Sequence, residues 1–185
     1  MNKPYIIGID PGFTGAVAVL DTATMKCVAV EDIPVYRKVS KFRKSGEMSH
    51  VDVHKLAMII DAFSSKTAIA VIEEVGAMPR QGLSSTFRFG YAAGECHGVL
   101  AANYIPTIPI KPSVWKPALG LSGDKQNSID MARKHFVKSD RFFRFKKHHD
   151  RAEAALMAFY ATKYLTGMID KAREPIRVKG SSGVA

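Results

Sequence analysis

Five short segments of this chain are almost wholly apolar, and they constrain the fold more than any other feature. The first reads Tyr-Ile-Ile-Gly-Ile over residues 5–9 and ends at Asp10. Runs of this length and composition are typical of strands that are buried on both faces of a sheet. The other four cover residues 15–20, 27–30, 67–75 and 107–110. A sheet buried on both faces requires a layer of helices on each side.

The connections between these runs predict the order of the strands. The turn residues Asp10-Pro11-Gly12 join the first two runs, and the first three runs follow one another closely enough for an antiparallel meander. Longer connections with helical spacing of apolar residues surround the later runs, which favours parallel crossovers. The sequence therefore predicts an α/β fold. Its mixed five-stranded sheet has three antiparallel strands, then parallel βαβ crossovers, with helices on both faces.

The first helix is predicted from a capping pattern. Ser49 is typical of an N-cap, with Asp52 three residues later and an amphipathic helix after it that reaches Phe63. Further helices are expected over residues 85–103, from Gly123-Asp124 onward, and over residues 150–165.

The helix expected over residues 85–103 carries a stripe of glycines at four-residue spacing. They are Gly90, Gly94 and Gly98. An interior glycine costs a helix about 1 kcal/mol relative to alanine. A repeated stripe therefore indicates close approach of another backbone, which is either the sheet or a partner helix.

The chain reads as one domain over residues 1–170, with a tail over 171–185 that lacks periodicity and is expected to be disordered. Residues 36–50 are basic and Ser-rich, and we interpret them as a mobile loop. Cys27 and Cys96 are the only cysteines, which excludes a disulfide scaffold and suits inert buried thiols.

The charge balance points to a polyanionic partner. The chain has 27 Lys and Arg against 17 Asp and Glu, a formal net charge of +10, and nucleic acid is the commonest such partner. At 46% hydrophobic residues the chain is not globally disordered. Because no apolar run approaches about 18 residues and Met1-Asn2-Lys3-Pro4 is not a signal peptide, we expect a cytoplasmic protein without membrane contact.

Four acids stand where metal chemistry would need them. Asp10 ends the first strand, Glu73 ends the fourth, and Asp150 and Glu153 share one face at the start of the last helix. The first and fourth strands are neighbours in the predicted sheet, so their acids can converge. Carboxylate oxygens suit Mg²⁺, and two such ions can hydrolyse a phosphodiester.

Each acid also has a structural explanation. Asp10-Pro-Gly suits a simple turn, and Asp150 with Glu153 suits the dipole of a helix start. Glu73 and Glu74 point to opposite faces of their strand, so one of them can be a solvated strand end. The four acids together, in this order of elements, are more specific than any one alone.

Three segments resemble the motif blocks of the RuvC family of Holliday junction resolvases, in the same order. They are Ile7-Gly8-Ile9-Asp10-Pro11-Gly12, Val71-Ile72-Glu73-Glu74-Val75 and His149-Asp150-Arg151-Ala152-Glu153-Ala154-Ala155-Leu156. The similarity spans about residues 5–165, and other features look more like bacteriophage-type members. The resemblance implies a ribonuclease H-like fold.

The resemblance also implies an activity. It points to a metal-dependent endonuclease that resolves four-way and other branched DNA junctions by paired symmetric cuts, leaving 5′-phosphate and 3′-hydroxyl ends. The expected metal ligands are Asp10, Glu73, Asp150 and Glu153, which would hold two Mg²⁺ ions, with Mn²⁺ as a substitute. The expected assembly is a homodimer on branched DNA, without a small-molecule cofactor.

Two departures from the family pattern stand out. The fourth acid is usually Asp, whereas this chain has Glu153. The bacterial enzyme has a wedge-like Phe three residues after the second acid, where this chain has Gly76. The candidates for a wedge here are Phe13, Met78, Phe87 and Phe89.

Basic and imidazole side chains complete the candidate site. His149 is a candidate to orient water or touch the scissile phosphate, and Lys125 resembles a family lysine near that phosphate; both also suit a basic surface. Trp115 reads as core. The candidate DNA-binding residues are Arg37, Lys38, Lys41, Arg43, Lys44, Lys111, Lys116, Lys125, Arg144, Lys146 and Lys147.

Other functions fit parts of the pattern. A YqgF-like RNA-processing or repair nuclease would share the fold, and a catalytically silent nucleic-acid-binding protein would share the charge. Actin-like sugar and acetate kinases begin with a turn resembling residues 9–15, but they are duplicated and far longer than this chain.

Overall fold

The structure is a computed structural model that describes residues 5–39, 47–63, 68–77 and 80–172. Three of the candidate DNA-binding residues, Lys41, Arg43 and Lys44, lie outside these ranges, as does the wedge candidate Met78. The tail predicted from residue 171 also lies outside them, apart from the last two residues of the final helix.

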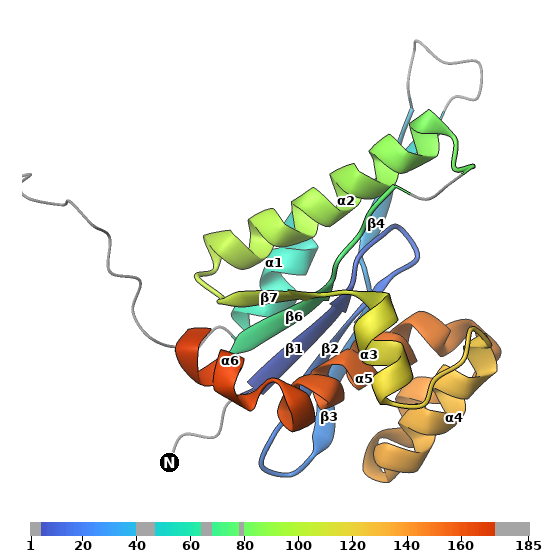
Figure 1. The fold of residues 1–185 in the computed structure, drawn as a ribbon. Helices are drawn as coiled ribbons and strands as arrows, with labels where there is room; N and C mark the ends of the chain where they lie inside the picture. The colour runs from blue at the N-terminus through green and yellow to red at the C-terminus, as the bar shows by residue number, and fades with distance from the viewer. Residues whose placement is uncertain (1–4, 40–46, 64–67, 78–79, 173–185) are drawn as a thin grey trace, which may run out of the picture.

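A five-stranded mixed sheet forms the centre of the fold, as predicted (Figure 1). The strands run in the order β3-β2-β1-β6-β7, antiparallel from β1 to β3 and parallel from β1 through β6 to β7. Their bounds are Tyr5–Asp10 (β1), Ala16–Asp21 (β2), Lys26–Asp32 (β3), Ile69–Glu73 (β6) and Thr107–Ile110 (β7). The apolar runs of the sequence are therefore the five strands; β1, β2 and β6 are mostly buried, whereas the edge strand β3 exposes several of its residues.

Helices cover both faces of this sheet, which confirms the predicted layers. One apolar cluster joins alternate strand residues such as Ile7 and Ile9 to α1 and α2. The other joins Ile6 and its face of the sheet to α3, α4 and α5. The helices are α1 (Val53–Asp61), α2 (Leu83–Ala102), α3 (Pro112–Ala118), α4 (Lys125–His135), α5 (His149–Tyr164) and α6 (Thr166–Ala172).

α5 lies directly against β1 because Gly8 has no side chain. A Cβ at Gly8 would overlap the carbonyl oxygen of Ala154 in α5. Strand alternation then places Asp10 on the same face as Gly8, toward the helix that carries Asp150. This contact brings the first strand and the last helix together at the edge where the predicted site lies.

The predicted mobile loop over residues 36–50 is wrong where the structure describes it. Strand β4 (Val35–Val39) pairs antiparallel with β5 (Glu47–Val51) as a separate two-stranded sheet. Tyr36 and His50 face each other across this pair, with ring centroids 5.4 Å apart. These strands lack an apolar face of their own, so the sequence showed no alternating pattern.

The cap of the first helix is also corrected. Ser49 lies within β5, and α1 instead begins after Asp52, whose side chain accepts a hydrogen bond from the backbone N–H of Lys55 at 3.1 Å. Asp52, which the sequence predicted as the second residue of a capping box, is itself the N-cap of α1.

Short helices were missed between the last strand and α5. α3 begins at Pro112, which suits the first turn of a helix because proline has no N–H to leave unpaired. Two 3₁₀ helices, η1 (Val137–Phe143) and η2 (Lys146–His148), occupy the basic, aromatic stretch before α5. None of the described helices is long and apolar enough to cross a membrane.

The glycine stripe of α2 does not pack on the sheet. A Cβ built at Gly90, Gly94 or Gly98 would meet no described atom within 4 Å. The sheet alternative for this stripe is therefore wrong. The buried residues of α2, such as Cys96 and Leu100, lie on the opposite side of the helix.

Replacement of Gly8 tests the close contact between β1 and α5. We expect Gly8→Ala to force these elements apart and lower the free energy of unfolding by about 1–3 kcal/mol, the usual cost of overpacking. Denaturant unfolding followed by circular dichroism measures this change. Gly167→Ala in α6 is the matched control, because a Cβ there meets nothing within 4 Å. Equal stability of the two variants would contradict the contact.

Candidate active site

The four predicted acids converge at one edge of the central sheet. Asp10 ends β1 and Glu73 ends the adjacent parallel strand β6. Asp150 and Glu153 lie in the first turns of α5, and the Asp10 carboxyl, when protonated, donates a hydrogen bond to the carboxylate of Asp150. All four side chains are partly buried. The sequence therefore identified the acids that the fold brings together.

The charge of this cluster falls most heavily on Asp10. Burial raises the pKa of Asp10 well above its usual value, and the carboxylates of Glu73, Asp150 and Glu153 raise it further. Burial also raises the pKa values of Glu73 and Asp150, which repel each other and Glu153. Like charges held in a poorly solvated site disfavour ionisation, so the cluster favours a cation.

Lys116 supplies one positive charge to the cluster. Its Nζ lies 2.8 Å from Oε2 of Glu153, and its charge lowers the pKa values of Asp10 and Glu73. The same contacts raise the pKa of Lys116, although burial opposes that change. Lys116 was predicted to contact DNA phosphates, and the structure places it among the acids.

Two further side chains fix the glutamates. The indole Nε1–H of Trp115 donates to Oε1 of Glu73 at 3.1 Å, and the hydroxyl of Ser128 donates to Oε1 of Glu153 at 3.0 Å. Trp115 is fully buried, as predicted, but it also holds a site carboxylate. Ser128 was missed, because no sequence pattern distinguishes a serine that faces the site from one that faces solvent.

His149 and Lys125 extend the cluster on the Asp150 side. His149 Nε2 lies 2.8 Å from Lys125 Nζ and 2.9 Å from Asp150 Oδ1. A neutral ring accepts from the ammonium at this nitrogen, whereas a protonated ring donates to the carboxylate. Both residues therefore adjoin the acids, as the sequence predicted.

Glu74 faces away from the cluster, as strand alternation predicted. Its carboxylate lies 3.9 Å from Lys111 Nζ in an exposed pair, and its backbone N–H donates to Ile110. Lys111 is therefore a surface residue one strand away from Glu73.

The other candidate DNA-binding residues that the structure describes are exposed. Arg37 and Lys38 are exposed on β4. Arg144 is exposed and lies 3.9 Å from Asp140, and Lys146 and Lys147 are exposed in η2. Their role in DNA binding stays a prediction.

The wedge candidates differ in exposure. Phe87 is 73% exposed, whereas Phe13 lies beneath the guanidinium of Arg88 and Phe89 packs beside Gly12. A Cβ at Gly76, the position of the family wedge, would meet nothing within 4 Å.

The donor chemistry of the cluster suits a hard divalent cation. Its four carboxylates offer only oxygen ligands, which Mg²⁺ prefers. Within the described ranges, no three His, Cys, Asp or Glu side chains already stand in a metal-binding arrangement. The fit of a divalent cation to this cluster therefore rests on the oxygen donors and on the repulsion between the carboxylates, which a cation would relieve.

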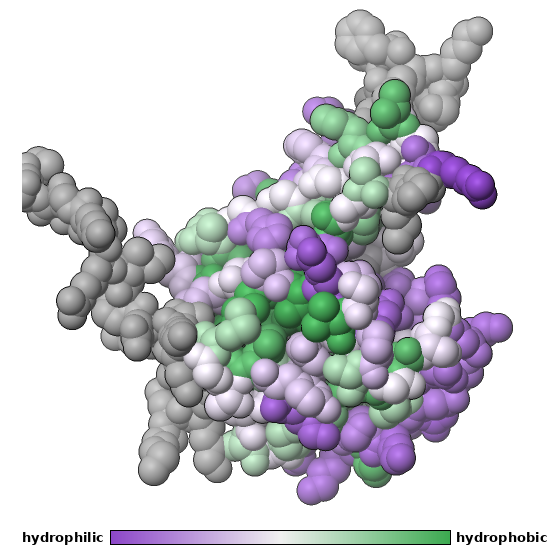
Figure 2. All heavy atoms as spheres, in the orientation of Figure 1, coloured by the Kyte–Doolittle hydropathy of each residue, from purple (hydrophilic) through white to green (hydrophobic). Residues whose placement is uncertain are grey.

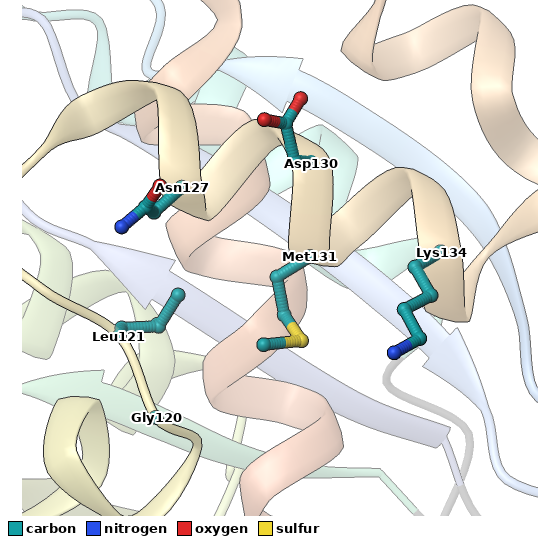
Figure 3. Close-up of a pocket in the computed structure, with 6 residues that line it drawn as sticks. All are labelled: Gly120, Leu121, Asn127, Asp130, Met131 and Lys134. Atoms are coloured by element: carbon teal, nitrogen blue, oxygen red, sulfur yellow. The ribbon is translucent and has the colours of Figure 1, made fainter.

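A pocket on α4 is separate from this cluster. Figure 3 shows a pocket of about 230 Å³ along α4, with Asn127, Asp130, Met131 and Lys134 aligned on one side of the helix. None of the four acids lines it, and its Asp and Lys are of opposite charge. It is therefore no candidate for the catalytic centre.

Both cysteines are buried, as expected. Burial raises the pKa of the Cys27 and Cys96 thiols to about 12. Thiols with such values are almost fully protonated at neutral pH, so they are poor nucleophiles and metal ligands.

Comparison with known proteins supports the fold. No protein-family model and no curated protein matches the chain. The chain is similar to Thermus thermophilus RuvC in complex with a Holliday junction substrate, with a TM-score of 0.54 and 17% identity. The match covers 86% of this chain and 95% of that chain. Another Thermus thermophilus RuvC structure matches with the same identity and a TM-score of 0.47.

At this identity the likeness shows the fold. The chain has a RuvC-like, ribonuclease H-like α/β fold, as the sequence motifs predicted.

The raised pKa values predict how stability depends on pH. A carboxyl whose pKa is higher in the folded than in the unfolded state destabilises the fold as pH rises from about 4 through the folded value. We expect Asp10→Asn to remove part of this penalty. Its melting temperature in EDTA should exceed that of the wild type by a margin that grows from pH 5 to pH 8, with about 2–4 °C for each 1 kcal/mol.

Differential scanning calorimetry at several pH values measures this margin. Mg²⁺ should raise the melting temperature of the wild type more than that of Asp10→Asn, because binding to the folded state stabilises it. Glu74→Gln is the control, since Glu74 lies outside the cluster. A difference in melting temperature between Asp10→Asn and the wild type that does not change with pH would contradict the repulsion between the carboxylates.

Proposed function

We propose that this protein is a divalent-metal-dependent endonuclease that cuts branched DNA, in particular four-way junctions. The convergence of four carboxylates at one edge of a RuvC-like sheet carries the proposal. The net charge of +10 suits a DNA partner. A solved structure of similar fold holds a Holliday junction substrate, which supports the choice of DNA geometry.

In this proposal Asp10, Glu73, Asp150 and Glu153 hold two Mg²⁺ ions, for which Mn²⁺ can substitute. Such ions lower the pKa of an attacking water and stabilise the leaving oxygen. Cleavage would leave 5′-phosphate and 3′-hydroxyl ends.

The protein's own residues orient these ligands and the phosphate. Trp115 donates a hydrogen bond to Glu73 at 3.1 Å, and Ser128 donates one to Glu153 at 3.0 Å. These bonds restrict the conformations of two proposed metal ligands before DNA binds. Lys116 and Lys125 place ammonium groups beside Glu153 and His149. In that position they can stabilise charge that develops on the phosphate oxygens.

Charge-neutral replacement of the acids tests the chemistry. We expect Asp10→Asn, Glu73→Gln and Asp150→Asn each to lower the cleavage rate of a four-way junction by at least about 10³-fold, because each removes a metal-binding charge. Junction binding should stay intact or become tighter, because less negative charge faces the DNA. Gel assays of cleavage and mobility shift measure the two properties separately.

Glu74→Gln is the matched control and should cleave like the wild type. If Glu74→Gln were inactive and Glu73→Gln active, the roles of the two glutamates would be reversed. Cleavage that persists in excess EDTA would refute the metal mechanism. Linear duplex cut as fast as the junction would refute the choice of substrate.

We also propose that the protein acts as a homodimer that pairs through the outer face of α2. Paired active sites suit a four-way junction, which needs two symmetric cuts. Gly90, Gly94 and Gly98 leave this face of the helix open, since a Cβ at each would touch nothing in the described chain. Small residues at this spacing let two helix backbones approach each other closely.

A bulky charge on this face tests the dimer. We expect Gly94→Glu to convert the dimer to a monomer at micromolar concentration in sedimentation velocity, and paired cuts to become single nicks. The fold should survive, because the position is open in the single chain. Val137→Glu, on an exposed residue of η1, is the control. A wild-type chain that stays monomeric with and without junction DNA would contradict the pairing.

A further inference from the structure

An ion pair outside the acid cluster attaches α5 to the sheet. The guanidinium of Arg151 donates two hydrogen bonds to the carboxylate of Asp32, the last residue of β3. Nε lies 2.6 Å from Oδ1, and Nη2 lies 2.8 Å from Oδ2. These hydrogen bonds hold the pKa of Asp32 below its usual value, so this carboxyl is ionised at neutral pH. A fork of this kind fixes the direction of a side chain as well as its distance.

Asp32 and Asp10 lie on the same rung of the central sheet. Asp10 pairs with Ala16 of β2, and Ala16 pairs in turn with Asp32 of β3. Residues that stand opposite each other in neighbouring strands project from the same face, so both aspartates lie on the face that α5 covers. Two strand spacings, about 10 Å, separate their positions. This rung therefore offers the helix a carboxyl group at each end.

Two consecutive residues of α5 bind these two carboxyl groups. Asp150 accepts a hydrogen bond from the protonated Asp10, and Arg151 donates to Asp32. Neighbouring residues of a helix point to different sides of it, so the two contacts hold the first turn of α5 from two directions.

Apolar packing restricts this part of α5 only weakly. The side chains that its first two turns bury are three alanines, Ala152, Ala154 and Ala155, and larger buried side chains begin at Leu156. Alanines offer only methyl groups as ridges, so they resist sliding or rotation of a helix less than large side chains do. The close approach of Gly8 to Ala154 fixes one point of the helix. A second fixed point is needed to set the direction of its first turn.

We infer that Arg151 is a positioning residue of the active site. Its ion pair with Asp32 sets the direction of the first turn of α5, and thereby the place of Asp150 and Glu153 in the acid cluster. Of the two side chains, 22% of Arg151 and 63% of Asp32 are exposed, so the pair adds little to overall stability. Its contribution is therefore geometric. The inference rests on the proposed function, in which these acids bind the metal ions.

Metal affinity in the absence of DNA tests this role. Binding of Mn²⁺ to the folded protein is measured by electron paramagnetic resonance, because the signal of the free ion falls as it binds. We expect Arg151→Ala and Asp32→Ala each to weaken Mn²⁺ binding about 10- to 100-fold, the usual effect of losing a residue that orients metal ligands. The double variant should bind no more weakly than either single variant, because both changes remove the same pair. Through charge alone, the two changes would act in opposite directions.

Arg133→Ala is the matched control. Arg133 and Asp140 form an ion pair with the same distance of 2.6 Å, which joins α4 to η1. Figure 2 shows mainly hydrophilic residues over the part of the surface where α4 lies. We expect Arg133→Ala to bind Mn²⁺ like the wild type. Tighter binding in Arg151→Ala together with weaker binding in Asp32→Ala would be an effect of charge and would overturn the positioning role.

Cleavage assays separate positioning from a direct contact with DNA. Arg151→Ala should lower the single-turnover cleavage rate of a four-way junction about 10- to 100-fold and leave the affinity for the junction unchanged. Weaker junction binding with unchanged Mn²⁺ affinity would assign Arg151 to the DNA and overturn the inference. Unchanged Mn²⁺ affinity in both single variants would also overturn it, while the proposed nuclease would stand. A wild type that binds no Mn²⁺ would instead refute the proposed metal site, and this inference with it.

Discussion

The close contact between β1 and α5 at Gly8 is the constraint on which the candidate site depends. Because no side chain separates the two backbones there, the first turn of α5 lies over the end of β1. Asp10 and Asp150 can then share a hydrogen bond, although they are far apart in the sequence. A larger residue at position 8 would move the helix outward, and the acids would separate with it. Packing in the core therefore decides the geometry of the chemistry at the edge.

The acids at this edge differ in how far neighbouring groups compensate their negative charge. Glu153 is paired with Lys116 and Ser128, and Glu73 receives the indole N–H of Trp115. Burial raises the pKa of Asp10 well above its usual value, three neighbouring carboxylates raise it further, and the charge of Lys116 opposes them. A cation that enters the cluster would gain most beside Asp10, since that carboxyl has the least compensation. Neighbouring side chains therefore fix Glu73 and Glu153, whereas the charge of Asp10 is the least compensated of the three.

Much of the fold and the acid cluster could be predicted from the sequence, for identifiable reasons. Buried strands leave continuous apolar runs. Strand alternation placed Glu73 and Glu74 on opposite faces, and the motif resemblance selected Glu73; Glu74 pairs with Lys111 outside the cluster. The β4–β5 pair was missed because its strands do not alternate between apolar and polar residues. The ion pair between Lys116 and Glu153 was missed for another reason. A lysine beside a buried Trp115 looks the same whether it faces DNA or an acid, and only the tertiary position of Glu153 distinguishes the two.

The turn after β1 links the two faces of the central sheet. It begins at Asp10, on the face of the sheet covered by α5, and reaches Phe13, which packs with the residues of the opposite face. Gly12, with φ of 139°, allows this crossing, and Phe89 of α2 packs beside it. A shift of α2 would therefore be transmitted to Asp10 through only three residues. If a second copy of the chain pairs along α2, as proposed, that contact acts on the helix whose Phe89 packs beside Gly12. Assembly can then influence the acid cluster without touching it.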